Sequence, residues 1–352
     1  MKKSSLAAAL LIAFAGTASA QSNVTIYGLL DVGLASVSNA TASTSTATGV
    51  APYSNGNEFK MTSGIQQGSR LGFKGTEELA PGLSAVFLLE SGILFDTGAS
   101  DQGGTLFGRQ AFVGLKSTSL GSITMGNQYA PQYLAWKTID PMDDGMAANA
   151  GSIINTSKIK RVSNSVLYTT PTFAGFTADL IYGLGEVTGL TSGSRNIGGS
   201  LIYKEGPITV KLAYNELNNA TALDAAKNTL IGGIYDLGML KLHGTYGTTK
   251  GLGTVDSTET LLGMTIPFGP HTILGSYIQK DDKTVANKDA SQVGLGYTYS
   301  FSKRTNLYTS FAKISNNNGS NYRTLSATAP ITGQNGAIGG TQEVNVGIRH
   351  IF

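Results

Sequence analysis

Hydrophobic and polar residues alternate one by one along many segments of the chain. The alternation is clearest in residues 208–215, 292–301 and 344–352, where nearly every second position is aliphatic or aromatic. A period of two residues is the pattern of a β-strand whose two faces lie in different surroundings. Each run is about ten residues long, the length of a tilted strand that crosses a membrane. The pattern predicts an all-β protein, and no segment after residue 20 has the length of a membrane-spanning helix.

The connections between these segments alternate in length. Short turns occur at 205–207, 237–238, 269–270 and 302–304, and longer polar stretches at 38–58, 97–104, 185–195, 218–227, 250–256, 282–289 and 316–340. Short turns at one end and long loops at the other are typical of an outer-membrane β-barrel. Counting the alternating segments predicts a transmembrane antiparallel barrel of about sixteen strands. Barrels of about 16–18 strands enclose an aqueous channel.

A soluble β-sandwich or β-helix is the alternative, because soluble antiparallel sheets also alternate. Two features favour the membrane barrel. One even set of strands follows the export signal described below, and aromatic residues stand near the strand ends, where interfacial girdles lie. The girdle candidates are Tyr27, Phe73, Tyr168, Phe173, Phe176, Tyr182, Tyr203, Phe268, Tyr277 and Phe301. In lipid every backbone group must be paired within the protein, so the predicted sheet closes on itself.

Residues 1–20 have the layout of a secretory signal peptide. Lys2 and Lys3 form a short positive region, residues 6–15 are apolar, and the small residues 18–20 form a cleavage pattern. The apolar run is about half of the roughly 20 residues that a spanning helix needs. We therefore expect residues 1–20 to be cleaved and residues 21–352 to form one exported barrel domain.

Composition excludes several classes of function. The chain has no cysteine, which excludes a disulfide framework and a thiolate metal site or nucleophile. Its formal charge is +3, or +1 without Lys2 and Lys3, so no charge imbalance points to nucleic acid. Gly accounts for 46 residues and Pro for 9, and glycines lie inside apolar segments such as 293–297. Glycine in a strand often marks a bend or a close approach of backbone, which a large curved sheet needs in many places.

Five segments carry recognisable motifs: 24–31 (VTIYGLLD), 69–79 (SRLGFKGTEEL), 106–115 (LFGRQAFVGL), 302–308 (SKRTNLY) and 346–352 (VGIRHIF). In this order they resemble the general porins of Gram-negative bacteria, in the version common among β-proteobacteria. The resemblance implies an outer-membrane channel for passive diffusion of small ions and hydrophilic solutes. It implies no enzyme activity, no cofactor and no metal.

The resemblance also implies partners and a constriction. It implies a homotrimer of sixteen-stranded barrels in contact with outer-membrane lipid and lipopolysaccharide. The third external loop is expected to fold into the lumen, and the matching segment, residues 130–162, is the longest connector in the sequence. A loop of that size is usually functional. The terminal Phe352 resembles the signal read by the barrel-assembly machinery, although it can also serve as a girdle aromatic.

The basic candidates for the constriction come partly from strand parity and partly from the resemblance. Selectivity in such a channel arises from fixed charges around a narrow point. By resemblance, Arg70, Arg109 and Arg161 match the arginines of the anion-selective members. Lys74 shares strand parity with Arg70, which independently predicts a basic pair facing the lumen. Strand parity does not assign Arg109 to the lumen, so this residue depends on the resemblance. Lys160 and Arg161 are neighbours in sequence, and we expect at most one of them to point to the pore centre. The expected preference is for anions.

The acidic candidates have two interpretations. Glu90 matches a lumen carboxylate of the family, and Asp140, Asp143 and Asp144 lie in the predicted infolded loop, where they can form the opposing wall. Alternatively, these carboxylates pair with the arginines and hold the loop in place. We favour this structural role for Glu90, because a carboxylate between arginines is stabilised as an anion. For the arginines we favour the functional role, because a guanidinium stays ionised and offers several donors to a passing anion.

Three other functions are open at this stage. A barrel enzyme needs a histidine paired with a nucleophile or an acid, and the contexts of His243, His271 and His350 do not resemble such a site. An adhesin or receptor would use the long loops, which are rich in Ser, Thr, Asn and Gly. A substrate-specific channel is the third alternative. An aromatic slide for sugars would have to be built chiefly from Tyr129, Tyr133 and Trp136.

Overall fold

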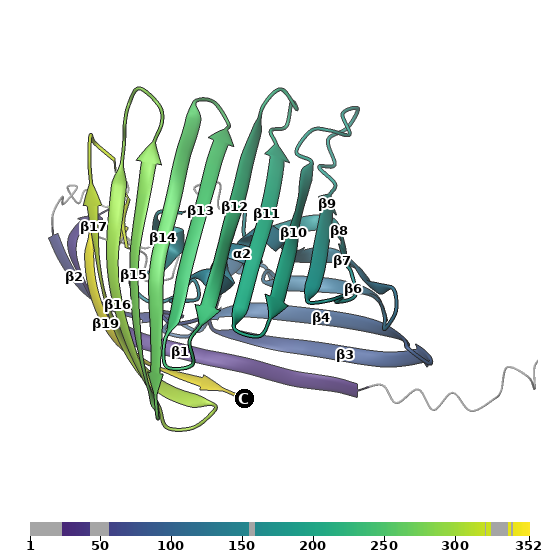
Figure 1. Ribbon diagram of the computed structural model, residues 1–352, viewed down its shortest axis with the longest axis horizontal. Coiled ribbons are helices and arrows are strands. Elements are labelled where there is room, and N and C mark those ends of the chain that lie inside the picture. The colour runs from purple at the N-terminus through teal and green to yellow at the C-terminus, as the bar shows by residue number, and fades with distance from the viewer. Residues whose placement is uncertain (1–22, 43–55, 155–158, 321, 325–336, 339–340) are drawn as a thin grey trace, which may run out of the picture.

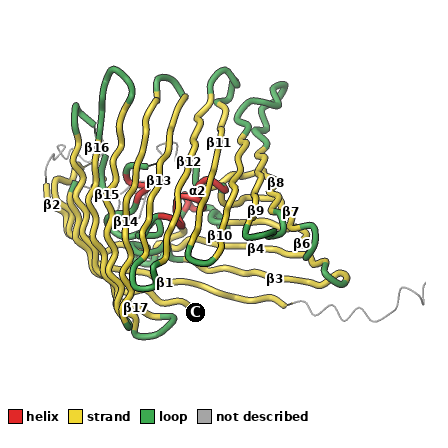
Figure 2. The backbone as a smooth tube through the Cα atoms, in the orientation of Figure 1, coloured by secondary structure: helices red, strands yellow, loops and turns green. Residues whose placement is uncertain are grey.

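The computed structural model describes residues 23–42, 56–154, 159–320, 322–324, 337–338 and 341–352. The strands form one closed antiparallel barrel, and the helical segments lie inside it (Figure 1, Figure 2). Residues 1–20 and much of the loops 38–58 and 316–340 lie outside the described residues. Signal-peptide cleavage therefore stays a prediction.

The strands follow the chain around the barrel, each paired with its neighbour. The first half contains β1 (Asn23–Ala42), β2 (Gly56–Ser63), β3 (Arg70–Ala80), β4 (Leu83–Leu94), β5 (Ala99–Ser100), β6 (Gln110–Ser117), β7 (Gly121–Tyr129), β8 (Arg161–Thr169) and β9 (Phe176–Gly183). The second half contains β10 (Asn196–Glu205), β11 (Ile208–Asn218), β12 (Ala225–Asp236), β13 (Lys241–Gly251), β14 (Val255–Phe268), β15 (His271–Asp282), β16 (Ala290–Ser300), β17 (Thr305–Asn316), β18 (Ala337–Ile338) and β19 (Gln342–Ile351).

These strand segments fill sixteen positions in the barrel. β2 and β3 pair with successive parts of β1 and so share one position. β5 and β18 are two-residue strands that pair with the ends of β4 and β1. The barrel closes where β1 pairs with β19, from Leu29 opposite Ile351 to Ser38 opposite Gln342. The predicted antiparallel barrel of about sixteen strands is confirmed.

Side chains on the strands alternate between the outer surface and the lumen. In β11, Leu212 and Tyr214 are exposed on the outside, whereas Asn215 on the other face is fully buried. Several expected girdle aromatics, among them Phe268 and Phe301, are exposed near strand ends. The expectation that Tyr27 belongs to a girdle is wrong, because its hydroxyl donates a hydrogen bond to a carboxylate on the lumen side.

One long connector enters the lumen between β7 and β8. Its described residues, 130–154 and 159–160, contain α2 (Pro131–Ile139) and the 3-10 turn η2 (Ala150–Ser152). Pro131 suits the first turn of the helix, where its missing N–H is not needed. The helix ends at Asp140, because a residue that precedes a proline avoids the helical conformation. The expected segment was 130–162, but residues 161 and 162 belong to β8 and therefore to the barrel wall. Among the described residues no helix is long and apolar enough to cross a membrane.

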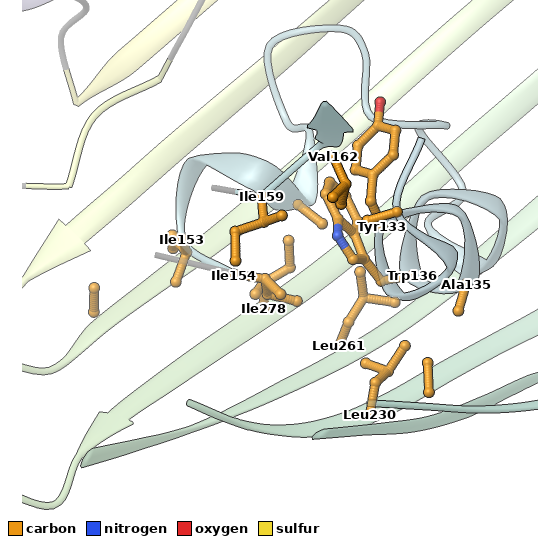
Figure 3. Close-up of a cluster of buried hydrophobic side chains, with 14 of the residues drawn as sticks. Tyr133, Ala135, Trp136, Ile153, Ile154, Ile159, Val162, Leu230, Leu261 and Ile278 are labelled. Carbon is orange, nitrogen blue, oxygen red and sulfur yellow. The ribbon is translucent and has the colours of Figure 1, made fainter. Parts of the chain in front are cut away.

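The infolded connector has its own apolar core against the barrel wall (Figure 3). Tyr133 and Trp136 of α2 are 4% and 2% exposed. They belong to one cluster with residues of the connector and of the wall: Ile153, Ile154, Ile159, Leu230, Leu261 and Ile278. Lumen-facing wall residues of a porin-sized barrel are usually polar. Here they are apolar because the connector covers them, and each large buried side chain contributes roughly 1.5–3 kcal/mol.

Glycines in the wall leave room for the connector. A Cβ added at Gly294 would lie 2.1 Å from Cβ of Ala148, and one at Gly263 would lie 2.7 Å from Cγ of Pro141. Two further glycines face the connector in the same way: Gly232 opposite Ile139, and Gly296 opposite Met146. These glycines within the strands therefore allow the connector to approach the backbone of the barrel wall closely.

Candidate pore constriction

Two arginines and a tyrosine converge on one carboxylate in the wall. Oε1 of Glu90, in β4, accepts a 2.7 Å hydrogen bond from Nε of Arg109 and lies 3.9 Å from Nη1 of Arg70. Oε2 of Glu90 accepts a 2.8 Å hydrogen bond from the hydroxyl of Tyr27. Glu90 and Arg109 are buried, and Arg70 is half-buried. Both oxygens of the carboxylate are thus engaged by the protein.

Arg109 reaches the lumen because it precedes β6 instead of belonging to it. In β6 the odd-numbered residues Val113 and Leu115 are exposed on the outside, so a regular strand would turn Arg109 outward. The backbone bends at this residue, whose N–H donates to the carbonyl oxygen of Glu90. The guanidinium lies close to the backbone of Gly68, since a Cβ added there would lie 2.8 Å from Nη1 of Arg109. This bend is not visible in the sequence alternation.

Arg161, the first residue of β8, extends the row of guanidinium groups. Its Nε donates a 2.7 Å hydrogen bond to the carbonyl oxygen of Arg109. Arg161 and Arg109 both donate to the hydroxyl of Tyr129, at 3.2 and 2.8 Å. The guanidinium of Arg161 also lies 4.9 Å from the centre of the Tyr129 ring, within reach of a cation–π interaction. We call Arg70, Arg109, Arg161, Glu90 and Tyr129 the arginine cluster.

Lys74 stands four residues beyond Arg70 on the same face of β3. Its ammonium lies 5.2 Å from the centre of the Tyr27 ring. It forms no ion pair with a carboxylate in the described part of the chain. Lys74 therefore adds an uncompensated positive charge close to the arginine cluster.

Asp140 lies inside the infolded connector and does not form a wall of the pore. Its carboxylate accepts hydrogen bonds from the N–H groups of Met142, Asp144 and Ala150, at 3.0, 3.3 and 3.0 Å. Burial raises the pKa of Asp140 to about 7, although the hydrogen bonds from Ala150 and Met142 act in the opposite direction. The residue joins α2 to η2 and shapes the connector.

The two other connector carboxylates each have a lysine partner. Asp144 accepts hydrogen bonds of 2.8 Å from Nζ of Lys160 and from the hydroxyl of Tyr133. Asp143 pairs with Lys137, which the sequence reasoning missed, and accepts a 2.9 Å hydrogen bond from Gln67. Lys160 thus turns toward Asp144, whereas Arg161 turns toward Tyr129. Both carboxylates are therefore compensated by lysines of the connector.

A further basic residue of the lumen, Arg349 in β19, was also missed. Its Nε donates a 2.9 Å hydrogen bond to Oδ1 of Asn306, and Nη1 donates at 3.2 Å to Oε1 of Gln67. The signal was present in the sequence, because Arg349 shares the polar parity of the last strand with Asn345. Tyr27 and Tyr129 gave no such signal, since a tyrosine suits either face.

The residues expected for the alternative functions have structural roles. Tyr133 and Trp136 are buried in the core of the connector, so they offer no aromatic slide to a sugar. Nδ1 of His243 lies 2.7 Å from the carbonyl oxygen of Ile139 and links the wall to α2. His271 and His350 contact Tyr297 and Thr305.

A closed sixteen-stranded barrel with a charged lumen and an infolded loop defines a channel-forming protein of the outer membrane. The chain belongs to the family described as Gram-negative porin, whose profile matches residues 7–319. The resemblance found in the sequence motifs is therefore confirmed.

Curated relatives and solved structures agree with this family. The chain is 35% identical to an outer membrane porin protein of Bordetella pertussis, over 89% of this chain and 94% of the relative. It is 34% identical to outer membrane porin protein 32 of Delftia acidovorans, over the full length of both. Among solved structures, the anion-selective porin from Comamonas acidovorans superposes with a TM-score of 0.75 at 26% identity, over 94% of this chain and all of that one.

Family and fold together establish the general activity. The protein is an outer-membrane porin, and its barrel is a passive diffusion channel for small hydrophilic solutes. It is not an enzyme, since its relatives are porins.

Proposed function

We propose that the channel prefers anions and that the arginine cluster, with Lys74, sets this preference. One observation carries the proposal: three guanidinium groups stand in a row that includes a single carboxylate, Glu90, and both oxygens of this carboxylate are already engaged, by Arg109 and Tyr27. Guanidinium groups stay ionised and present several donors. A passing anion thus meets more positive than negative charge at this side of the pore.

The carboxylates of the connector support the same preference. Asp143 and Asp144 pair with Lys137 and Lys160, and Asp140 is buried. The infolded connector, residues 130–160, narrows the lumen in this proposal, while its acidic groups contribute little net field to the pore. The anion selectivity named for the Comamonas acidovorans porin is a further support from a similar structure.

The test is the reversal potential of single channels across a potassium chloride gradient. We expect a potential of the sign for chloride preference, reduced in each of the variants Arg70→Gln, Arg109→Gln and Arg161→Gln. Arg304→Gln is the matched control, because this arginine is exposed in a short turn. Cation preference that persists in all three variants would overturn the proposal.

We propose a homotrimer as the assembled state, with contacts to lipid and lipopolysaccharide around it. Exposed apolar side chains on the outside of neighbouring strands support a buried contact, among them Val24, Ile26 and Val113 at 58%, 62% and 61% exposure. OmpT of Vibrio cholerae, which shares the fold at a TM-score of 0.64 and 15% identity, is described in a trimer form. Light scattering of the detergent-solubilised protein should give three times the mass of one chain; a monomer mass would contradict the trimer. Co-purified lipopolysaccharide, measured in the same preparation, tests the lipid partner.

We propose that Phe352 is read by the barrel-assembly machinery. Its backbone pairs with Gly28 in both directions at 3.1 Å, and its ring is 45% exposed. Phe352→Ala should lower the amount of folded barrel in the outer membrane, whereas in-vitro refolding should remain close to that of the unaltered protein. Equal losses in both measurements would indicate a purely structural role.

A further inference from the structure

A cavity of about 770 Å³ lies between the arginine cluster and the short-turn end of the barrel. Tyr129 of β7 and Leu134 of α2 line it at the constriction. Near the turns it is lined by residues 117–118, 121–122 and 169–172. The cavity thus lies beside the arginine cluster, on its short-turn side. Its volume falls in the range of small-molecule sites, about 300–1,000 Å³.

One part of the wall of this cavity carries apolar side chains although it faces the lumen, and polar residues line the rest. Lys74, Leu88 and Phe112 stand side by side on β3, β4 and β6, because Lys74 pairs with Leu88 and Leu88 pairs with Phe112. One step toward the turns, Val86 and Leu167 line the same space. Leu134, 39% exposed, faces it from α2. Leu167 also packs against the apolar core of the connector, whereas Leu88 and Phe112 are not part of that core.

Two ammonium groups stand next to this apolar part of the wall. Lys74 lies in the same row as Leu88 and Phe112. Lys116 follows Phe112 by four residues in β6 and therefore lies on the same face of that strand. Within the described ranges neither lysine forms an ion pair with a carboxylate. Three nearby acidic groups are not among the lining residues. Glu90 is engaged by Arg109, and Asp179 accepts from Thr169 and Ser200. Glu78 lies in the row of Lys116, with Ser84 of β4 between them.

We propose that this cavity is a weak binding site for organic anions with an apolar body, with aromatic carboxylates as the best-fitting class. The ring lies against Leu88, Phe112 and Leu134, and the carboxylate lies between Lys74 and Lys116. Gln110 supplies a further polar contact in the lining. Such a site raises the local concentration of the solute beside the constriction, and it must bind weakly so that the solute leaves again. The inference extends the proposed anion preference to a class of organic solute.

The experiment compares three probes at equal ionic strength in single-channel recordings. Benzoate carries both ring and charge, acetate carries the charge alone, and benzyl alcohol carries the ring alone. We expect benzoate to interrupt the chloride current in a saturable way, and the two partial probes to have effects at least about tenfold weaker at the same concentration. Equal effects of benzoate and acetate would overturn the proposal.

Variants locate the effect. Lys74→Gln should weaken the benzoate effect about tenfold, because it removes a charge-assisted contact. Phe112→Ser should weaken it about threefold or more, because it removes the aromatic contact. Lys204→Gln is the matched control, since this lysine shares the lumen-facing parity of Ser200 in β10 and does not line the cavity. Unchanged block in both cavity variants would also overturn the proposal.

Failure of this inference and failure of the anion preference give different results. Arg161→Gln should reduce the reversal potential in chloride while benzoate, measured by saturation-transfer NMR on the solubilised protein, still binds. A cation-preferring channel that binds benzoate would contradict the proposed ion preference alone. A chloride-preferring channel without benzoate binding would contradict this inference alone.

Discussion

Nε of Arg109 donates a 2.7 Å hydrogen bond to Oε1 of Glu90, and both side chains are buried in the wall of a water-filled barrel. The pair joins β4 to the bend that precedes β6. Its consequence is electrostatic, because the one carboxylate of the arginine cluster is held by a guanidinium and a phenol instead of facing the solute.

Glu90 both compensates positive charge at the pore and holds Arg109 in place, and replacement of its carboxylate should separate these two roles. In Glu90→Gln we expect the preference for chloride to increase, because the positive charges lose their counter-charge. We also expect the barrel to lose about 3 kcal/mol of stability, because Arg109 is left buried without its partner. The reversal potential and the midpoint of urea unfolding measure the two effects. Glu205→Gln, at an exposed turn, is the control, and an unchanged reversal potential would contradict the assigned charge balance.

Salt should weaken the selectivity. The proposed preference arises from fixed charges that act over several ångströms of water, and the Debye length falls from about 10 Å at 0.1 M to about 3 Å at 1 M. We expect the chloride-to-potassium permeability ratio, measured at a constant concentration gradient, to fall toward 1 as ionic strength rises. A ratio that is independent of salt would indicate selection by direct coordination or by size.

We expect the connector to shift when a glycine that it packs against is replaced by a larger residue. A Cβ at Gly294 would lie 2.1 Å from Cβ of Ala148, so Gly294→Val requires the connector to shift. Overpacking of this kind costs about 1–3 kcal/mol. We expect higher single-channel conductance and more current noise than in the unaltered channel. Gly244→Ala is the control, because the atoms nearest to its added Cβ lie 3.9 Å away; equal conductance in both variants would show that the connector does not limit the current.

The packing of the connector should depend on pH through Asp140. Burial raises its pKa from 3.8 to about 7, so the folded connector binds this proton more tightly than the unfolded chain does. The resulting stabilisation is fully present below pH about 4 and is lost as the pH rises to about 7. We expect current noise to increase over that range. Asp140→Asn keeps an acceptor oxygen and should remove the pH dependence, and an unchanged profile in this variant would assign the effect to another group.

Local pattern was sufficient for the barrel and for part of the pore. Alternation in residues 208–215 and 292–301 predicted β11 and β16, because a strand between lipid and water must place apolar side chains on one face. The same rule placed Arg70 and Lys74 on one face of β3. The same rule also places Arg349 on the lumen face of the last strand with Asn345, although Arg349 was not predicted as a pore residue.

Other features depend on contacts between distant segments. Asp140 and Asp144 look alike in sequence, yet one is enclosed by backbone N–H groups and the other pairs with Lys160. Leu230 and Leu261 face the lumen but are covered by the connector, whereas Leu88 and Phe112 face it and are not part of the connector's core. A strand pattern records which face a side chain occupies, and it does not record what lies opposite.

The sequence by itself determined the membrane barrel and the family, because alternation, turn spacing and motifs are local properties of the chain. Only the tertiary structure decided how the charges of the lumen are arranged. Arg109 enters the lumen through a bend before its strand, and Glu90 meets it from the neighbouring strand. Charge pairing depends on distances across strands and across the lumen, and closure of the barrel and packing of the connector determine those distances.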